Sequence, residues 1–288
     1  VLKINLNKMR QYFMLKLIKT SVVTIVVVFV TVILIVILQQ LSSKDEVEVI
    51  ISLEGLHIAP LESSKKAVPK FSDYSDVTEK KRAFFEYLQP EIQRQNAIVL
   101  KEREMVLALQ EVFMQQQRFN KHQQKVFDKL ANKYQFSSDE VQSVEQTLET
   151  LVRRVDTIPE ALVLVQAANE SGWGTSRFAQ KGYNFFGLWC FKEGCGFVPK
   201  QRTDEAVHEV AKFKDLSHAV MTYIRNLNRH YAYKDLRIIR QNLRQEGKPV
   251  TAIALTAGLS SYSERGQEYI DELLSMLRVN TQYMDIAS

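Results

Sequence analysis

A single glutamate at the end of an apolar run is the residue best placed to do chemistry. Residues 161–168 read Ala-Leu-Val-Leu-Val-Gln-Ala-Ala, and Asn169, Glu170 and Ser171 follow. A helix that is apolar on nearly every side is buried, so this pattern predicts Glu170 at the C-terminal end of a buried helix. The negative end of the helix dipole and partial burial both favour the neutral acid. We therefore expect a raised pKa for Glu170, which suits a general acid that protonates a leaving oxygen.

The alternative from this pattern alone is a solvated glutamate at a frayed helix end. Gly172 and Gly174 follow and end the predicted helix. They would also let a sugar chain approach the backbone closely, because glycine has no side chain. Trp173, three residues after Glu170, is expected in the core.

Two sequence phrases at a fixed separation carry a family resemblance. Residues 168–174 read Ala-Asn-Glu-Ser-Gly-Trp-Gly, and residues 183–188 read Tyr-Asn-Phe-Phe-Gly-Leu. Together they resemble the signature of glycoside hydrolase family 73, the β-N-acetylglucosaminidases of bacterial cell walls. The continuation Trp-Cys-Phe at 189–191 and the segment 80–90 are similar, more closely, to the Bax family of proteins related to the flagellar rod-associated glucosaminidase. The resemblance covers roughly residues 78–280.

This resemblance implies a lysozyme-like fold and assigns roles to particular residues. Glu170 matches the family's general acid, and Tyr262 matches a C-terminal tyrosine that lines the substrate cleft. Tyr183, Asn184 and Trp189 are expected along the sugar groove, where aromatic faces stack on pyranose rings. Tyr269 is expected to pack within an amphipathic helix.

The second carboxylate of the reaction is less well defined, because its position varies among related enzymes. Glu209 is the preferred candidate, since it shares one face of a predicted strand with apolar neighbours. The other acids of the β-lobe are Glu193, Asp204 and Glu205. A 2-acetamido sugar can also supply its own carbonyl as the nucleophile, in which case Tyr262 would help to orient the acetamido group.

The N-terminal region predicts a membrane anchor. Residues 1–19 contain five basic residues and no acid, and residues 20–43 contain no charged residue. About 20 apolar residues suffice for a helix to cross a bilayer, and the preceding basic residues keep a cytoplasmic tail inside. A cleaved signal peptide is the alternative, although its apolar region is usually shorter. We expect a single-pass protein of the bacterial inner membrane, with its catalytic domain in the periplasm.

The remaining chain predicts a mainly α fold with one small β-lobe. Residues 44–77 are expected to be a linker, 78–134 a helical accessory region and 135–288 the lysozyme-like domain. An apolar residue recurs every seven positions from Phe85 to Phe113, but the row three positions later is mixed. A coiled coil needs both rows, so packing against the chain's own domain is favoured. Aromatic and alternating residues in 183–214 predict the β-lobe.

Cysteine content and charge limit the other possibilities. Cys190 and Cys195 are the only cysteines, and they form either a disulfide, which export would permit, or two free thiols. No metal or other cofactor is expected. The net charge of +5 equals that of residues 1–19, so no basic patch predicts nucleic-acid binding. The sequence leaves the oligomeric state open.

The predicted function is hydrolysis of β-1,4 bonds at N-acetylglucosamine in the glycan strands of peptidoglycan, with Glu170 as the acid. One alternative is a lytic transglycosylase, which acts on the same polymer and leaves an anhydro sugar. The other is a non-catalytic scaffold that binds the cell wall and uses its long helix for partners.

Overall fold

The computed structural model of the chain describes residues 14, 27–37, 59, 61–134, 143–199 and 208–284. The chain divides into two units, Val1–Ile50 and Ile51–Ser288. In the first unit, residues 27–37 are helical. Among the described residues, no helix combines the length and the apolar character that membrane crossing requires. Most of the predicted anchor at 20–43 lies outside the described residues, as does the β-like run at 47–53, so the anchor stays a prediction.

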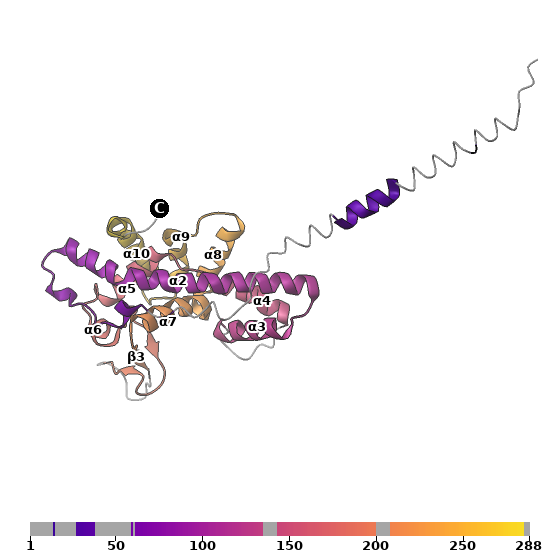
Figure 1. Cartoon of the computed structure of the whole chain (residues 1–288). Helices are drawn as coiled ribbons and strands as arrows, with labels where there is room; N and C mark the ends of the chain where they lie inside the picture. The colour runs from indigo at the N-terminus through magenta and orange to yellow at the C-terminus, as the bar shows by residue number, and fades with distance from the viewer. Residues whose placement is uncertain are drawn as a thin grey trace, which may run out of the picture. The chain divides into compact units, whose positions relative to one another are not determined.

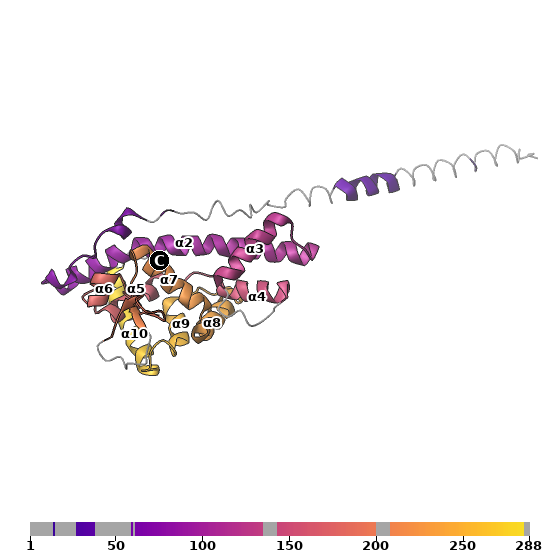
Figure 2. The same ribbon diagram turned by 90° about the horizontal axis from the view of Figure 1, so that it is seen from below.

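The second unit is mainly helical and is built along one long helix, α2 (Val77–Gln116). In Figures 1 and 2, helices α3 and α4 lie beside its C-terminal half, while α5, α6 and the small sheet lie beside its N-terminal half. The other helices are α3 (Lys121–Tyr134), α4 (Val144–Arg154), α5 (Glu160–Ser171), α6 (Arg177–Gly182), α7 (Leu216–Arg229), α8 (Lys234–Gln245), α9 (Ala252–Thr256) and α10 (Gln267–Asn280).

The seven-residue apolar row of α2 packs inside its own unit. Phe85, Ile92, Val99 and Val106 are buried in the main hydrophobic core. The helix continues through Pro90 and ends where Gln117 adopts a left-handed conformation with φ 55°. The favoured prediction for 78–134 is therefore confirmed in its packing, but the region forms two helices instead of one.

Part of the predicted linker belongs to the folded unit. The 3-10 helices η2 (Glu62–Lys65) and η3 (Phe71–Asp73) contribute buried residues to it. The Phe71 ring is fully buried against Phe84 and Tyr87, with ring centroids 5.4 and 6.0 Å apart. Ser64 donates a 2.5 Å hydrogen bond to the buried Glu91 carboxylate. Residues 61–76 thus differ from the linker expected there, because their aromatic and polar side chains are anchored in the core.

The start of α5 is fixed by a buried polar cluster around Asp156. Arg240 is buried and donates hydrogen bonds to the carbonyls of Asp156 and Thr157 at 3.0 and 3.1 Å. Arg244 donates to both Asp156 carboxylate oxygens at 3.0 and 3.2 Å. Charged groups of this kind are tolerated inside a protein only when they are paired. The cluster joins α8 to the loop before α5 and sets the point from which α5 enters the core.

A three-stranded antiparallel sheet forms the predicted β-lobe. Strands β1 (Trp189–Cys190), β2 (Gly196–Phe197) and β3 (Glu209–Ala211) are arranged with β3 in the centre. Trp189 pairs with Val210, and Gly196 pairs with Ala211. The structure thus confirms the mainly α fold with a small sheet, although its strands are shorter than expected.

Candidate active site

Helix α5 carries Glu170 in its last turn, as the apolar pattern predicts. Residues from Ala161 to Ala168 are all buried, and Glu170 is half-buried. The helix ends at Gly172, whose left-handed backbone donates to the carbonyls of Ala168 and Asn169. The Glu170 carboxyl is therefore presented by a rigid element that is fixed on all sides by the core.

Asn184 organises the loop that lies across from Glu170. It is only 1% exposed. Its amide donates 2.9 Å hydrogen bonds to the carbonyls of Leu188 and Ala211, and its carbonyl oxygen accepts from the backbone of Leu188 at 3.0 Å. These bonds occupy the side chain, so Asn184 holds the 184–188 loop against the β-lobe; its place in a sugar groove stays a prediction that these contacts do not favour.

That loop brings a glycine beside the glutamate. Gly187 has φ +63°, and a side-chain carbon built there would lie 3.4 Å from Glu170 Oε2. The glycine therefore leaves the carboxyl room on that side. By contrast, a carbon on Gly174 would lie 2.4 Å from the Phe71 ring. The close approach expected between Gly174 and a sugar is instead an approach to Phe71.

A chain of buried hydrogen bonds also leads to Glu170. Tyr223 donates to Gln166 Oε1, and Gln166 Nε2 lies 2.9 Å from the Tyr269 hydroxyl oxygen. Tyr269 in turn hydrogen-bonds to Glu170. Because Gln166 donates to Tyr269, the phenolic proton of Tyr269 is free to point to the Glu170 carboxylate. Gln166 is the one polar residue in the 161–168 run, and that signal could have marked it as part of the site.

The pKa of Glu170 is raised from its ordinary value, as predicted. Burial is the largest cause, and the neighbouring Glu272 carboxylate adds to it. The hydrogen bond from Tyr269 and the charge of Arg265 act in the opposite direction and limit the rise. A carboxyl with a raised pKa retains its proton closer to neutral pH, which is the property that a general acid requires.

Aromatic rings form a layer next to the carboxyl. Tyr262 stacks on Tyr269 with ring centroids 5.5 Å apart and planes 4° apart, and Phe186 stacks on Tyr223 at 4.0 Å. Burial raises the pKa of Tyr262 well above its ordinary value. The Tyr262 hydroxyl donates to the Phe186 carbonyl at 2.8 Å, so this residue ties the 184–188 loop to the C-terminal region. Its contact with substrate stays a prediction.

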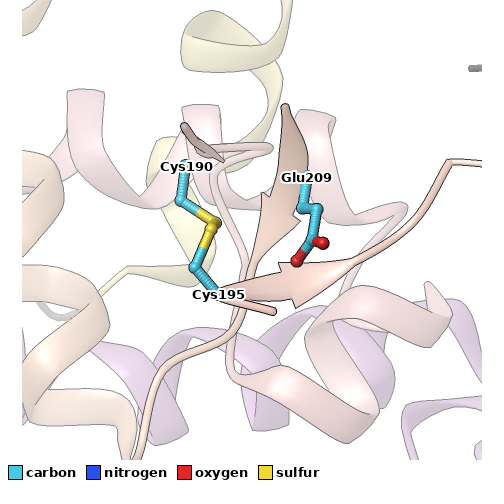
Figure 3. Close-up of side chains that lie close together, drawn as sticks. All are labelled: Cys190, Cys195 and Glu209. Atoms are coloured by element: carbon cyan, nitrogen blue, oxygen red, sulfur yellow. A yellow bond between two sulfur atoms is a disulfide. The ribbon is translucent and has the colours of Figure 1, made fainter. Parts of the chain in front are cut away.

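Glu209 has a different setting from Glu170. It lies on β3, is 2% exposed, and accepts hydrogen bonds from the backbone nitrogens of Gly194 and Gly196 at 2.9 and 2.7 Å. Figure 3 shows its side chain near the Cys190–Cys195 disulfide. This geometry assigns Glu209 to holding the turn between β1 and β2. Its catalytic role stays a prediction that these contacts do not favour.

Among the described residues, Cys190, Cys195 and Glu209 form a group that could hold a metal ion by its spacing. Their potential ligand atoms lie within 4.8 Å of one another. Both sulfurs are already bonded to each other, and the carboxylate accepts two backbone N–H groups. In this oxidised form the group does not suit a metal ion, because thiolate is the form of cysteine that binds metals.

The remaining predicted residues differ in their exposure and their contacts. Trp189 is 49% exposed, with its ring edge against His208, and is open to stacking on a sugar. The Tyr183 hydroxyl donates to the Lys66 carbonyl at 3.1 Å and contacts the N-terminal segment. Trp173 packs against Phe84 and Phe85, as expected for a core residue. Asp204 and Glu205 fall outside the described residues.

A known family matches the part of the chain that contains this site. A family model described as "Mannosyl-glycoprotein endo-beta-N-acetylglucosaminidase" matches residues 145–282, which include α5, the β-lobe and α10. The chain thus carries a glucosaminidase domain, a domain of glycosidase type whose substrates are glycans.

A curated relative identifies the family more closely. The chain is 32% identical over 219 residues to "Protein bax" of Escherichia coli (strain K12), and the match covers 76% of each protein. The chain therefore belongs to the Bax-like family of glucosaminidase-domain proteins. No solved structure matches it significantly.

Proposed function

We propose that this protein is a peptidoglycan hydrolase that cleaves the β-1,4 bond after N-acetylglucosamine, with Glu170 as its general acid. The observation that carries the proposal is the Glu170 carboxyl itself. It sits at the end of a buried helix, its pKa is raised by burial, and Gly187 leaves space beside it. The glucosaminidase domain supports a glycan as the substrate.

In the proposed reaction, Glu170 gives its proton to the glycosidic oxygen as the bond to the sugar's C1 breaks. The acetamido oxygen of the same sugar attacks C1, so the positive charge passes from C1 to a cyclic oxazolinium ion, as in substrate-assisted glycosidases. Water then opens this cyclic intermediate and returns a proton to the Glu170 carboxylate. This scheme needs no second protein carboxylate, which agrees with the engagement of Glu209 in the β-lobe turn.

The proposed location is the outer face of the bacterial inner membrane, in the periplasm. Two features support it. Residues 20–43 lack charge and follow a basic segment, and the Cys190–Cys195 disulfide suits an oxidising compartment.

The test is digestion of purified peptidoglycan by the full chain in mild detergent, beside its Glu170→Gln variant. We expect new N-acetylglucosamine reducing ends from the wild type, read by mass spectrometry, and a rate about 10²–10⁴-fold lower for the variant, the usual contribution of a general acid. Anhydro-muramic ends would instead indicate a lytic transglycosylase. Equal rates for the two chains would contradict the role of Glu170.

A further inference from the structure

A pocket of about 460 Å³ lies next to the candidate active site, between the start of α2, the end of α5 and helix α10. Its walls include Lys81, Asn169, Trp173, Glu272 and Val279. Asn169 directly precedes Glu170 in the sequence, and the charge of Glu272 acts on Glu170. The pocket wall therefore includes residues that neighbour Glu170.

Lys81 provides the charge of the pocket. Its ammonium lies 5.1 Å from the centre of the Trp173 ring and 5.5 Å from that of Tyr283. Among the described residues, no carboxylate lies within ion-pair distance of it. The acid across the pocket, Glu272, is paired with Arg265 at 2.7 Å. Lys81 is thus held by aromatic rings and remains able to bind an anion.

The mixed polar and apolar lining of the pocket limits the classes of ligand that fit it. Apolar atoms of Ala168, Trp173, Met276 and Val279 lie beside the polar groups of Asn169 and Ser275. A neutral sugar offers an ammonium only uncharged oxygen acceptors, whereas a peptide offers carboxylates together with amides and apolar side chains. In peptidoglycan the peptides branch from the glycan strand, and their carboxylates are the strand's main anions.

We propose that this pocket binds the peptide branch of the glycan strand, with the Lys81 ammonium pairing a peptide carboxylate. The assignment of the branch to peptidoglycan rests on the function proposed above. Binding of the peptide branch makes the protein selective for strands that still carry peptides. Lys81 is then a binding residue that takes no part in breaking the sugar bond.

The first experiment measures binding, with the catalytically silenced Glu170→Gln full chain and calorimetry. The probes are a soluble disaccharide–tetrapeptide and the same disaccharide without its peptide, with its lactyl carboxyl capped as a simple amide so that it carries no anion. We expect Lys81→Met to weaken binding of the peptide-bearing probe about tenfold, the value of one charge-assisted contact, and to leave the other probe unaffected. Lys81→Arg should restore most of the affinity because it keeps the positive charge.

Two further variants serve as controls. Lys80→Met removes the neighbouring charge, which does not line the pocket, and should change neither affinity. Val279→Trp fills the pocket from its exposed rim without removing Lys81 and should also weaken binding of the peptide-bearing probe alone. Equal affinity of wild type and Lys81→Met for the peptide-bearing probe would overturn the proposal, as would an equal loss on both probes.

The second experiment separates this inference from the proposed function. Cleavage is measured on intact peptidoglycan and on strands stripped of peptide by an amidase, with their freed lactyl carboxyls capped as amides. We expect Lys81→Met to lower kcat/KM on the intact polymer alone. Lys81-dependent binding without cleavage of either substrate would sustain the pocket and refute the proposed hydrolysis. Cleavage of both substrates at rates that Lys81→Met does not change would support the proposed hydrolysis and refute the proposed role of the pocket.

Discussion

At the scale of single residues, the site depends on how the environment of Glu170 differs from water. Burial and the nearby Glu272 carboxylate raise its pKa, while Tyr269 and Arg265 oppose the rise. Because these effects oppose each other, the Glu170 carboxyl can hold a proton before the reaction and can still donate it to the leaving oxygen. The same balance means that the ionised carboxylate is a cost to folding.

The pH dependence of stability should reveal this cost. Because the pKa of Glu170 is higher in the folded state, the folded protein binds the proton more tightly, and its stabilising effect is lost as pH rises through the folded pKa. Glu170→Gln should therefore be more stable than wild type above that pKa, with the difference shrinking toward pH 4. Thermal unfolding across pH measures this. A constant difference at all pH values would contradict the assignment.

Gln166 is expected to set the direction of the hydrogen bond that reaches Glu170. Gln166→Leu removes the partner of two buried tyrosine hydroxyls and should destabilise the fold by about 1–3 kcal/mol, because the Tyr223 hydroxyl is left without a partner. Without this partner the Tyr269 hydroxyl is no longer fixed toward the carboxylate, so the alkaline limb of the pH–rate profile should move to higher pH.

The control for Gln166 is Tyr223→Phe. It removes the far end of the chain and leaves the Gln166–Tyr269 bond in place. We expect reduced stability for this variant with an alkaline limb close to that of wild type. If Gln166→Leu lost stability with no movement of the limb, Gln166 would be a packing residue only.

At the scale of elements, the site is assembled from parts that are separate in sequence. Helix α5 supplies the acid, the 184–188 loop supplies Gly187, and α10 supplies Tyr269. Two side chains that resemble site residues, Asn184 and Tyr262, hold the loop in place through backbone carbonyls. The elements therefore contribute as much through their fixed positions as through the groups they present.

The β-lobe gives a test at this scale. Glu209→Gln keeps the shape of the side chain but replaces one of the two acceptor oxygens that bind Gly194 and Gly196. We expect the lobe to exchange its amide hydrogens faster, at a local cost of about 1–3 kcal/mol, with catalysis falling less than for Glu170→Gln. A loss of activity as large as that of Glu170→Gln, with unchanged exchange, would restore Glu209 as a catalytic residue.

At the scale of the whole molecule, the folded unit extends further toward the N-terminus than the glucosaminidase match. The family model begins at residue 145, yet α2 and residues 61–76 contribute core residues, including Phe71, Phe84 and Phe85. The helical accessory region is part of the core against which α5 packs. The buried face of α5 would be exposed without it.

This organisation predicts the effect of cutting the chain. Phe71→Ala removes a fully buried ring that packs on Gly174 and should lower the free energy of unfolding by about 3–5 kcal/mol. A chain that starts at residue 77 should be destabilised at least as much as Phe71→Ala, whereas one that starts at residue 61 should unfold like the longer protein. Denaturant unfolding compares them, and equal stability of the two truncated chains would contradict the prediction.

Features that depend on local pattern can be predicted from the sequence alone. The apolar run at 161–168 predicted a buried helix with Glu170 at its end, because a helix without a polar face has nowhere to lie but the core. The alternating and aromatic residues predicted a small sheet. Two phrases of the chain were enough to indicate the family and with it the glycosidase class.

Tertiary structure decided what each polar group near the site binds. Glu209 and Asn184 are good candidates by residue type, but their hydrogen bonds go to the backbone of the β-lobe and its loop. Gln166 is the one polar residue of an apolar run, yet it links Tyr223 and Tyr269, which lie 57 and 103 residues away from it in the sequence. Partners so distant in sequence are chosen by packing, since a buried polar group must find an acceptor or donor wherever the fold places one.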